Sequence, residues 1–292
     1  MLIDTVETIG HLNFDHVIHV VQDPASTRHL FECELGIHTI AGGMHPAWGT
    51  FNMLAYFGLP YIEWLGVHDV KTALNTEFGR NALNKLLIGE GAIQFAMRTR
   101  HMDELVKLWM QRQLPFVGPI EASRERPDGT TIRWRMLFPE QLSESVSARN
   151  QALLPFVIEW DKDDESRLIE LREGGALLSQ DVLRLDAVHL ATLDATDWIH
   201  RFNIYFGNKL FEEDKELCFA QTTSPFQIKI GEISVFVWSL TRVAECFHDQ
   251  EEVTASGLFQ IDLSRIGHTS KKDDMNITPL VLAGLRVQIH HD

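Results

Sequence analysis

Hydrophobic and polar positions follow one another along the chain in a pattern that occurs twice. The segments 14–36, FDHVIHVVQDPASTRHLFECELG, and 185–207, LDAVHLATLDATDWIHRFNIYFG, align without a gap. Identical residues stand at the aligned pairs Asp15/Asp186, Val17/Val188, Asp23/Asp194, His29/His200, Phe31/Phe202 and Gly36/Gly207. An ungapped match of this kind indicates an internal duplication.

Both copies predict the same local structure. An apolar run typical of a strand precedes an aspartate that can cap a helix, and an amphipathic helix of about a dozen residues then ends at a glycine. A weaker third copy lies at 91–114, where Leu105, Leu108 and Trp109 have helical spacing and Pro115 follows.

Strand-like stretches follow each of these strand–helix openings. They cover 38–43, 48–58 and 61–67, then 115–120, 130–138 and 154–160, and finally 216–221, 226–231 and 234–240. The pattern therefore predicts three βαβββ units. Two further strands, at 257–263 and 284–291, are candidates for a fourth and degenerate unit.

A charged stretch separates the second unit from the third. The sequence DKDDESRLIELREGG covers 161–175 and ends in paired glycines, as linkers between domains often do. We place a domain boundary there, which gives a paired βαβββ domain at 1–168 and a degenerate C-terminal domain at 169–292.

Composition narrows the class of partner. Of the 292 residues 45% are hydrophobic and 23% are charged, which is typical of a globular protein. Acidic residues outnumber basic ones 41 to 26, a net charge of −15 that disfavours nucleic acid and anionic membranes as partners. A small-molecule substrate is the expected partner, and a homodimer is left open.

The three cysteines, Cys33, Cys218 and Cys246, have no CxxC spacing and an odd count, which favours free thiols in a reducing compartment. The N-terminus lacks the basic and apolar regions of a signal peptide, and no apolar run has the length of a spanning helix. These features predict a cytoplasmic location.

The tripeptide Ile-Glu-Trp occurs at 62–64 and again at 158–160, each time on the predicted last strand of a βαβββ unit. Side chains alternate between the two faces of a strand, so each glutamate opposes its flanking Ile and Trp. If the apolar face packs on the helix of the unit, Glu63 and Glu159 occupy equivalent places on the other face.

The motifs FDHVIHVVQD, GGMHPAWGTFN, YIEWLGV, RPDGTTIRWR and LPFVIEWD together resemble the glyoxalase-like domain family of the vicinal-oxygen-chelate superfamily. The resemblance extends over roughly residues 13–161. It implies an α+β fold in which tandem βαβββ modules form a cup-shaped mixed sheet with helices on the outer face, followed here by a degenerate C-terminal module.

The resemblance also implies a divalent metal ion on the floor of the cup. The ligand positions fall on His16, Glu63 and Glu159, and a fourth falls on Ile93 or, with a shift of one residue, on Gln94. One imidazole and two carboxylates suit Zn, Fe, Mn or Ni. In the third unit the position of His16 is Ala187. The alternative is that both glutamates are ordinary exposed carboxylates and His16 is a core histidine.

Three further residues are candidates for the site. His45, in the loop GGMHPAWGT, is an acid–base candidate, although this glycine-rich loop could equally be a structural turn. Arg133 and Arg135 alternate with apolar residues, so they either clamp a substrate carboxylate inside the cup or lie on a solvated face with a salt bridge to Glu159.

These residues lead to two functional hypotheses. The first is a metal-dependent enzyme that chelates a small oxygenated substrate, an isomerase or lyase more than a dioxygenase, with Glu159 or His45 as catalytic groups. The second is a metal-free protein that binds or sequesters a small molecule, of the bleomycin-resistance type.

Overall fold

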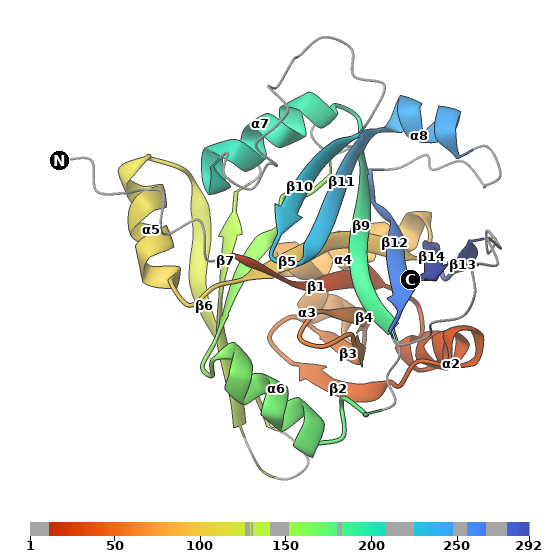
Figure 1. The fold of residues 1–292 in the computed structure, drawn as a ribbon. Coiled ribbons are helices and arrows are strands. Elements are labelled where there is room, and N and C mark those ends of the chain that lie inside the picture. Colours follow the sequence, from red (N-terminus) through yellow and green to blue (C-terminus); the bar gives the residue numbers. More distant parts are fainter. Residues whose placement is uncertain are drawn as a thin grey trace.

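The computed structural model describes residues 12–125, 129, 131–140, 152–179, 183–207, 225–247, 256–266 and 279–291. It confirms the α+β class and the tandem βαβββ modules (Figure 1). The predicted strand at 216–221, Cys218 and most of the RPDGT segment at 126–130 lie outside these ranges.

Four modules follow one another along the chain. The first contains β1 (Asn13–Val20), α2 (Pro24–Leu35), β2 (Ile40–His45), β3 (Thr50–Tyr56) and β4 (Tyr61–Val67). The second contains β5 (Gly91–Arg98), α5 (Met102–Gln111), β6 (Phe116–Glu125), β7 (Thr131–Pro139) and β8 (Phe156–Trp160). The third contains β9 (Leu183–Thr192), α7 (Ala195–Phe206), β10 (Phe226–Ile230) and β11 (Ile233–Ser239), and the fourth β12 (Gly257–Arg265), β13 (Leu280–Leu282) and β14 (Leu285–His291).

The duplicated aspartates cap helices, as the sequence predicts. The Asp23 side chain accepts hydrogen bonds from the backbone N–H groups of Ala25 and Ser26 at the start of α2. Asp194 does the same for Asp197 at the start of α7. Gly36 ends α2 at a φ of 66°, a left-handed conformation that glycine adopts without strain.

The same pairing scheme builds two cups in one continuous sheet. In the first cup, β1 pairs in parallel with β4 and antiparallel with β5, and β5 pairs in parallel with β8. In the second, β9 has the same relation to β11 and β12, and β12 pairs in parallel with β14. The strands β12 and β14 thus complete the cup of the third module within the chain. The two cups meet where Leu258 pairs with Ala92.

The helices α2, α5 and α7 pack on the outer, apolar face of the sheet. Trp109 of α5 joins the two halves of the molecule, because its indole N–H donates to the Tyr205 carbonyl of α7 at 3.0 Å. Two inserted segments add helices elsewhere: α3 (Val70–Leu74) and α4 (Glu77–Ile88) after the first module, and α6 (Asp164–Glu173) after the second.

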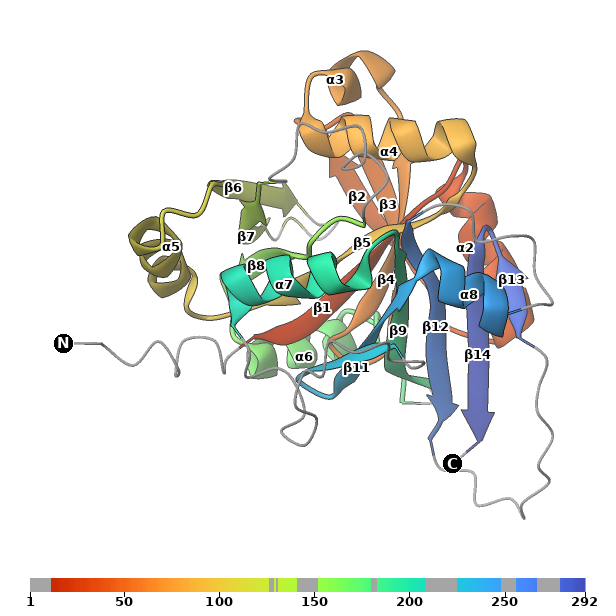
Figure 2. The same cartoon turned by 90° about the horizontal axis from the view of Figure 1, so that it is seen from above.

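The helix α4 lies over the concave face of the first cup, where it packs against β1, β4 and β5 (Figure 2). The helix α6 runs across the predicted boundary at 168/169, so the charged stretch that suggests a linker is an ordered helix here. A final helix, α8, spans Leu240–Cys246. No helix in the described ranges is both long and apolar enough to cross a membrane.

His19 ties the first strand to the C-terminal hairpin. Its Nε2 lies 2.7 Å from the Ala283 carbonyl in the turn between β13 and β14. Its Nδ1 is buried and has no hydrogen-bond partner in the described part of the chain. Burial lowers the pKa of His19 from 6.5 to about 4, although the bond to Ala283 opposes that shift.

This buried histidine predicts a loss of stability in mild acid. The unfolded chain takes up the proton first as the pH falls, so stability is lost between about pH 6.5 and pH 4. From pH 7 to pH 4.5, the wild type should lose about 2 kcal/mol more unfolding free energy than His19→Gln, which keeps a side-chain N–H donor. Urea denaturation at both pH values measures the difference, and equal losses in the two proteins would contradict it.

Candidate functional site

A cavity of about 430 Å³ lies inside the first cup. Phe78 of α4 lines it, as do Arg167, Glu170 and Leu171 of α6. Its walls carry aromatic side chains from both modules and from α4: Trp48, Tyr56, Tyr61, Phe78, Trp134, Phe138, Phe156 and Trp160. A cavity of this size, with a few polar groups in apolar walls, is typical of a small-molecule site.

His16 stands on the cavity wall between two aromatic rings. Tyr61 stacks on its imidazole at 4.5 Å between ring centroids, and Phe156 meets it edge-on at 5.6 Å. Both rings come from the first position of a last strand, β4 or β8. The imidazole therefore lies between the two modules, close to the pairing of β1 with β5.

A β-bulge brings Asp15 to its neighbour His16. The pairing of β1 with β5 steps from Phe14 to His16 and leaves Asp15 as the extra residue. Its Oδ1 lies 2.7 Å from His16 Nδ1, although neighbours on a regular strand face opposite sides. Asp15 also accepts a hydrogen bond from the Trp160 indole at 3.1 Å and contacts Arg167 at 3.5 Å.

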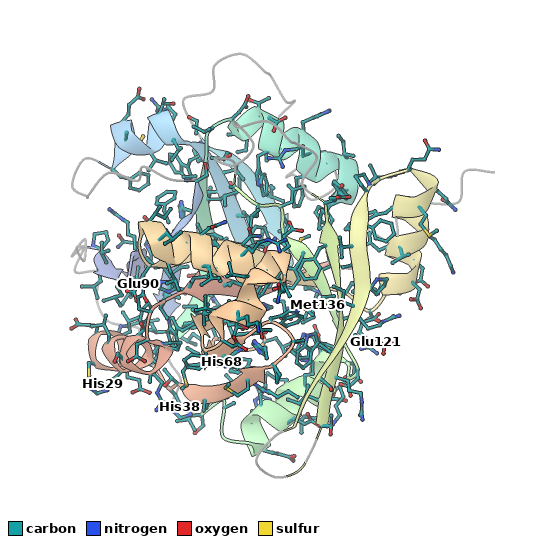
Figure 3. The ribbon with its side chains drawn as sticks, turned by 180° about the vertical axis from the view of Figure 1, so that it is seen from behind. His29, His38, His68, Glu90, Glu121 and Met136 are labelled. Atoms are coloured by element: carbon teal, nitrogen blue, oxygen red, sulfur yellow. The ribbon has the colours of Figure 1, made fainter. Side chains whose placement is uncertain are left out.

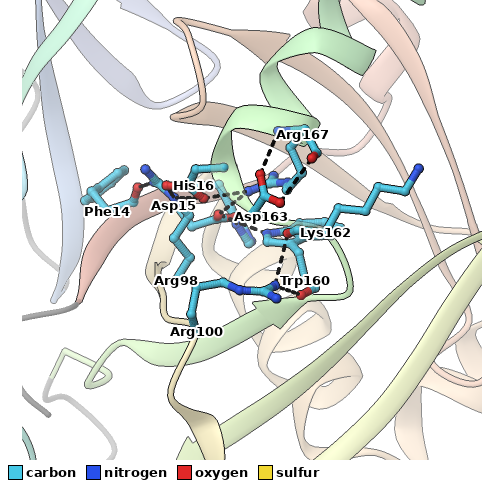
Figure 4. A network of polar contacts seen from close by, with 11 residues as sticks. Phe14, Asp15, His16, Arg98, Arg100, Trp160, Lys162, Asp163 and Arg167 are labelled. Atoms are coloured by element: carbon cyan, nitrogen blue, oxygen red, sulfur yellow. Dashed lines mark hydrogen bonds and ion pairs between the residues drawn. The ribbon is translucent and has the colours of Figure 1, made fainter.

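Asp15 is fully buried yet ionised. Figure 4 shows its contacts with His16 and Arg167. Burial alone would raise the pKa of its carboxyl, but Arg167 and the hydrogen bond from His16 outweigh it and hold the pKa at about 2. An ionised Asp15 accepts the proton on His16 Nδ1. The other ring nitrogen, Nε2, then faces Glu63, whose Oε2 lies 3.4 Å away.

Glu63 is positioned by Asn52 from the adjacent strand β3. The Asn52 amide donates to Glu63 Oε1 at 2.6 Å and accepts from the Gly43 N–H at 2.7 Å. Its nitrogen also lies 3.4 Å from Nε2 of His45. A Cβ at Gly42 would overlap the Asn52 oxygen, so only glycine leaves room for the amide there.

His45 is the last residue of β2 and also lines the cavity. Its Nδ1 lies 3.0 Å from the Thr50 hydroxyl. Burial lowers the pKa of His45, while the nearby charge of Glu63 opposes that shift. The loop is the turn of the β2–β3 hairpin, and its histidine also lines the cavity. The segment therefore has a structural role and also supplies a polar group to the cavity.

Glu159 lies on the opposite face of the sheet from Glu63, although both stand in the same tripeptide. Phe156, Ile158 and Trp160 line the cavity, and Glu159 does not. Because Phe156 occupies the place of Tyr61 beside His16, Ile158 occupies the place of Glu63. The tripeptide is thus shifted by one residue along the strand, and such a shift turns every side chain to the other face.

Arg133 and Arg135 are also directed away from the cavity, because Ile132, Trp134, Met136 and Phe138 of β7 line it. Arg135 pairs with Glu159 and, at 2.8 Å, with Asp103 of α5. Of the two alternatives for Arg135, the structure shows the salt bridge to Glu159. Figure 3 shows Met136 and, on the neighbouring strand β6, the exposed Glu121.

Sequence comparison identifies the family. The profile of the glyoxalase-like domain matches residues 14–205. The chain belongs to the glyoxalase-like domain family. No curated protein matches this glyoxalase-like chain.

One solved structure shares the fold of the whole chain. A hypothetical protein from Staphylococcus aureus superposes with a TM-score of 0.74 at 18% identity, over 96% of this chain and 100% of that one. Methylmalonyl-CoA epimerase from Mycobacterium tuberculosis has a TM-score of 0.37 at 15% identity, over 53% of this chain and 91% of its own. The first likeness shows the fold alone, and the second is too distant to support a function.

The residues of this glyoxalase-like chain do not fit the expected three-ligand metal site. His16 and Glu63 come together, whereas Glu159 is held by Arg135 and by the Met102 N–H on the other face. The fourth position supplies no ligand either, because Ile93 and Gln94 do not line the cavity. Among the described residues, no three His, Cys, Asp or Glu side chains form a group that could hold a metal ion.

Several residues that line the cavity or lie directly behind its wall were not predicted. Asp15 and His16 are neighbours in FDHV, but only the bulge turns them toward each other. Asn52 follows from no motif, although it stands two strands from His16 in the same module. Arg167 lies in the charged stretch that was interpreted as a linker. That stretch forms the helix α6, in which Arg167 and Leu171 are buried although most of its residues are charged or polar.

The buried Asp15 carboxylate predicts a large effect on stability. Asp15→Asn removes the buried ionised partner of Arg167 and leaves it only the half-exposed Asp164, 4.0 Å away. The unfolding free energy should therefore fall by about 3 to 5 kcal/mol. The control is Asp103→Asn, which removes a carboxylate 65% exposed beside Arg135 and should lower the unfolding free energy by about 1 kcal/mol or less. Urea denaturation compares the two variants, and equal losses would contradict the assigned role of Asp15.

Proposed function

We propose that this protein binds a small, flat and largely apolar molecule, whose hydroxyl or carbonyl group contacts His16 and Glu63. The observation that carries the proposal is the buried His16–Glu63 pair in an otherwise aromatic cavity of about 430 Å³. Such a cavity accommodates a ligand of two or three fused rings. Of the two hypotheses from the sequence, this is the small-molecule binding protein.

The polar pair suits a neutral ligand oxygen. Asp15 holds the Nδ1–H of His16, so Nε2 and the Glu63 carboxylate both face the cavity. A ligand hydroxyl placed there can donate its proton to the Glu63 carboxylate or to Nε2 of His16. Buried polar groups whose only further partner is a ligand discriminate strongly for a ligand that completes their hydrogen bonds.

The aromatic walls favour flat rings. Trp134 and Trp160 lie 5.5 Å apart between ring centroids, and Trp48 lies 5.5 Å from Phe78 on α4. Aromatic pairs add roughly 0.5 to 1.5 kcal/mol each beyond the burial of their surface. A ligand with fused rings can extend these contacts on both sides of the cavity.

A matched pair of glutamate variants tests the proposal with 2-naphthol as the probe. Glu63→Gln should weaken 2-naphthol binding about tenfold, because it removes the charged acceptor of the hydroxyl proton. Glu159→Gln changes the same residue type in the same tripeptide on the outer face, so binding should be unchanged. Isothermal titration calorimetry measures both dissociation constants.

Two controls separate this role from a general loss of structure. Binding of 2-methoxynaphthalene, which has no hydroxyl proton, should be insensitive to Glu63→Gln. Ile158→Trp, which fills the cavity, should abolish binding of both probes while circular dichroism shows an intact fold. No binding of either probe to the wild type, or binding that survives Ile158→Trp, would refute the proposal.

A metal-dependent isomerase or lyase is the second candidate. His16 and Glu63 favour it, because the resemblance assigns both to the metal and they lie 3.4 Å apart. Elemental analysis of protein purified without added metal or a polyhistidine tag tests it. The binding proposal predicts less than stoichiometric metal and no thermal stabilisation by Zn, Fe, Mn or Ni salts. Stoichiometric metal that is lost in both His16→Ala and Glu63→Gln would instead favour the enzyme.

We also propose that the protein is located in the cytoplasm. Cys33 and Cys246 are free and exposed, which supports a reducing compartment such as the cytoplasm.

A further inference from the structure

One cationic side chain of the cavity differs from the others. Arg124 of β6 lines the cavity and is partly buried. Its guanidinium forms no hydrogen bond or ion pair with the residues that the structure describes. Lys162 pairs with Glu170, and Arg167 contacts Asp15 and stacks on Trp160 at 4.2 Å from the ring centroid. Within the described chain, Arg124 is therefore the arginine or lysine of this cavity whose charge is left without a partner.

The backbone of β2 makes room for Arg124. A Cβ at Gly43 would overlap the Arg124 Cδ, so the glycine lets the arginine lie directly against the strand. The strands β2 and β6 are close neighbours at this edge of the two modules. Arg124 thus lines the cavity together with His45, Asn52 and Glu63.

The charge of Arg124 acts on His45, which also lines the cavity. It helps to lower the pKa of His45, after the larger effect of burial and against the attraction of Glu63. An unpaired guanidinium presents a planar fork of N–H donors that matches a carboxylate. A ligand carboxylate would supply a partner that the described residues do not.

We propose that the ligand of this cavity is an anionic aromatic molecule, an aryl carboxylate whose charge pairs with Arg124 while its hydroxyl or carbonyl group meets His16 and Glu63. The inference rests on the proposed function and adds the substrate class to it. The two charged groups differ in sign: Glu63 repels an anion and favours a neutral donor, whereas Arg124 attracts the anion. The site therefore orients the ligand as well as binding it.

The test uses 6-hydroxy-2-naphthoate and its uncharged isostere, 6-hydroxy-2-naphthamide, with binding measured by calorimetry. The wild type should bind the acid at least about tenfold more tightly than the amide, as expected for a charge-assisted hydrogen bond. Arg124→Gln should remove this preference by weakening the acid and leaving the amide unchanged. Arg133→Gln, which removes the same charge from the outer face of the neighbouring strand, should leave the preference intact.

The outcomes distinguish the two proposals. Suppose that the wild type binds the amide as tightly as the acid and that Ile158→Trp abolishes this binding. The anionic ligand class is then refuted, and the proposed function stands. The same holds if the preference for the acid persists in Arg124→Gln. If neither molecule binds the wild type, both are refuted together. Circular dichroism and the unchanged affinity for the amide show that Arg124→Gln is folded.

Discussion

The ionised carboxylate of Asp15 is the interaction on which the rest of the site depends. It is fully buried, and it is stable there because Arg167, Trp160 and His16 all direct N–H groups at it. Each partner comes from a different element: Arg167 from α6, Trp160 from β8 and His16 from β1. One charge therefore fixes the imidazole, closes one side of the cavity with a helix and joins the two modules.

The second constraint is the register of the strands around the cup, which sets the face of the sheet to which each side chain points. Residues that alternate along a strand face opposite sides, so the register decides which chemistry enters the cavity. In β4 the register places Tyr61 and Glu63 inside, whereas in β8 it places Phe156, Ile158 and Trp160 inside. The same one-residue shift turns Glu159 outward to Arg135, and it makes the second module an apolar, aromatic wall opposite a polar one.

The asymmetry between the two walls explains the character of the site. The first module carries the linked polar groups His45, Asn52, Glu63 and His16, and each contact restricts the next. The second module contributes mostly rings, together with Arg124 at its edge. The two modules have similar folds but carry different side chains at equivalent positions. The first therefore presents polar groups to the cavity, and the second presents a surface of aromatic rings.

The sequence by itself determined the elements and their order. The duplicated Asp caps, the glycine stops and the alternating apolar runs are local signals, so the βαβββ modules and the glyoxalase-like family were both predictable. His16, Glu63 and His45 were also identified as candidates, and all three line the cavity.

Only the tertiary structure decided which of the two glutamates meets His16. Strand register is set by pairing between distant segments, and in FVIEW both faces read as apolar, so no local pattern shows which one is inside. The same holds for the bulge at Asp15 and for the helix α6, whose inward residues are concealed in a charged stretch. Contacts that depend on long-range packing are absent from any short window of sequence, and they determined the chemistry of this cavity.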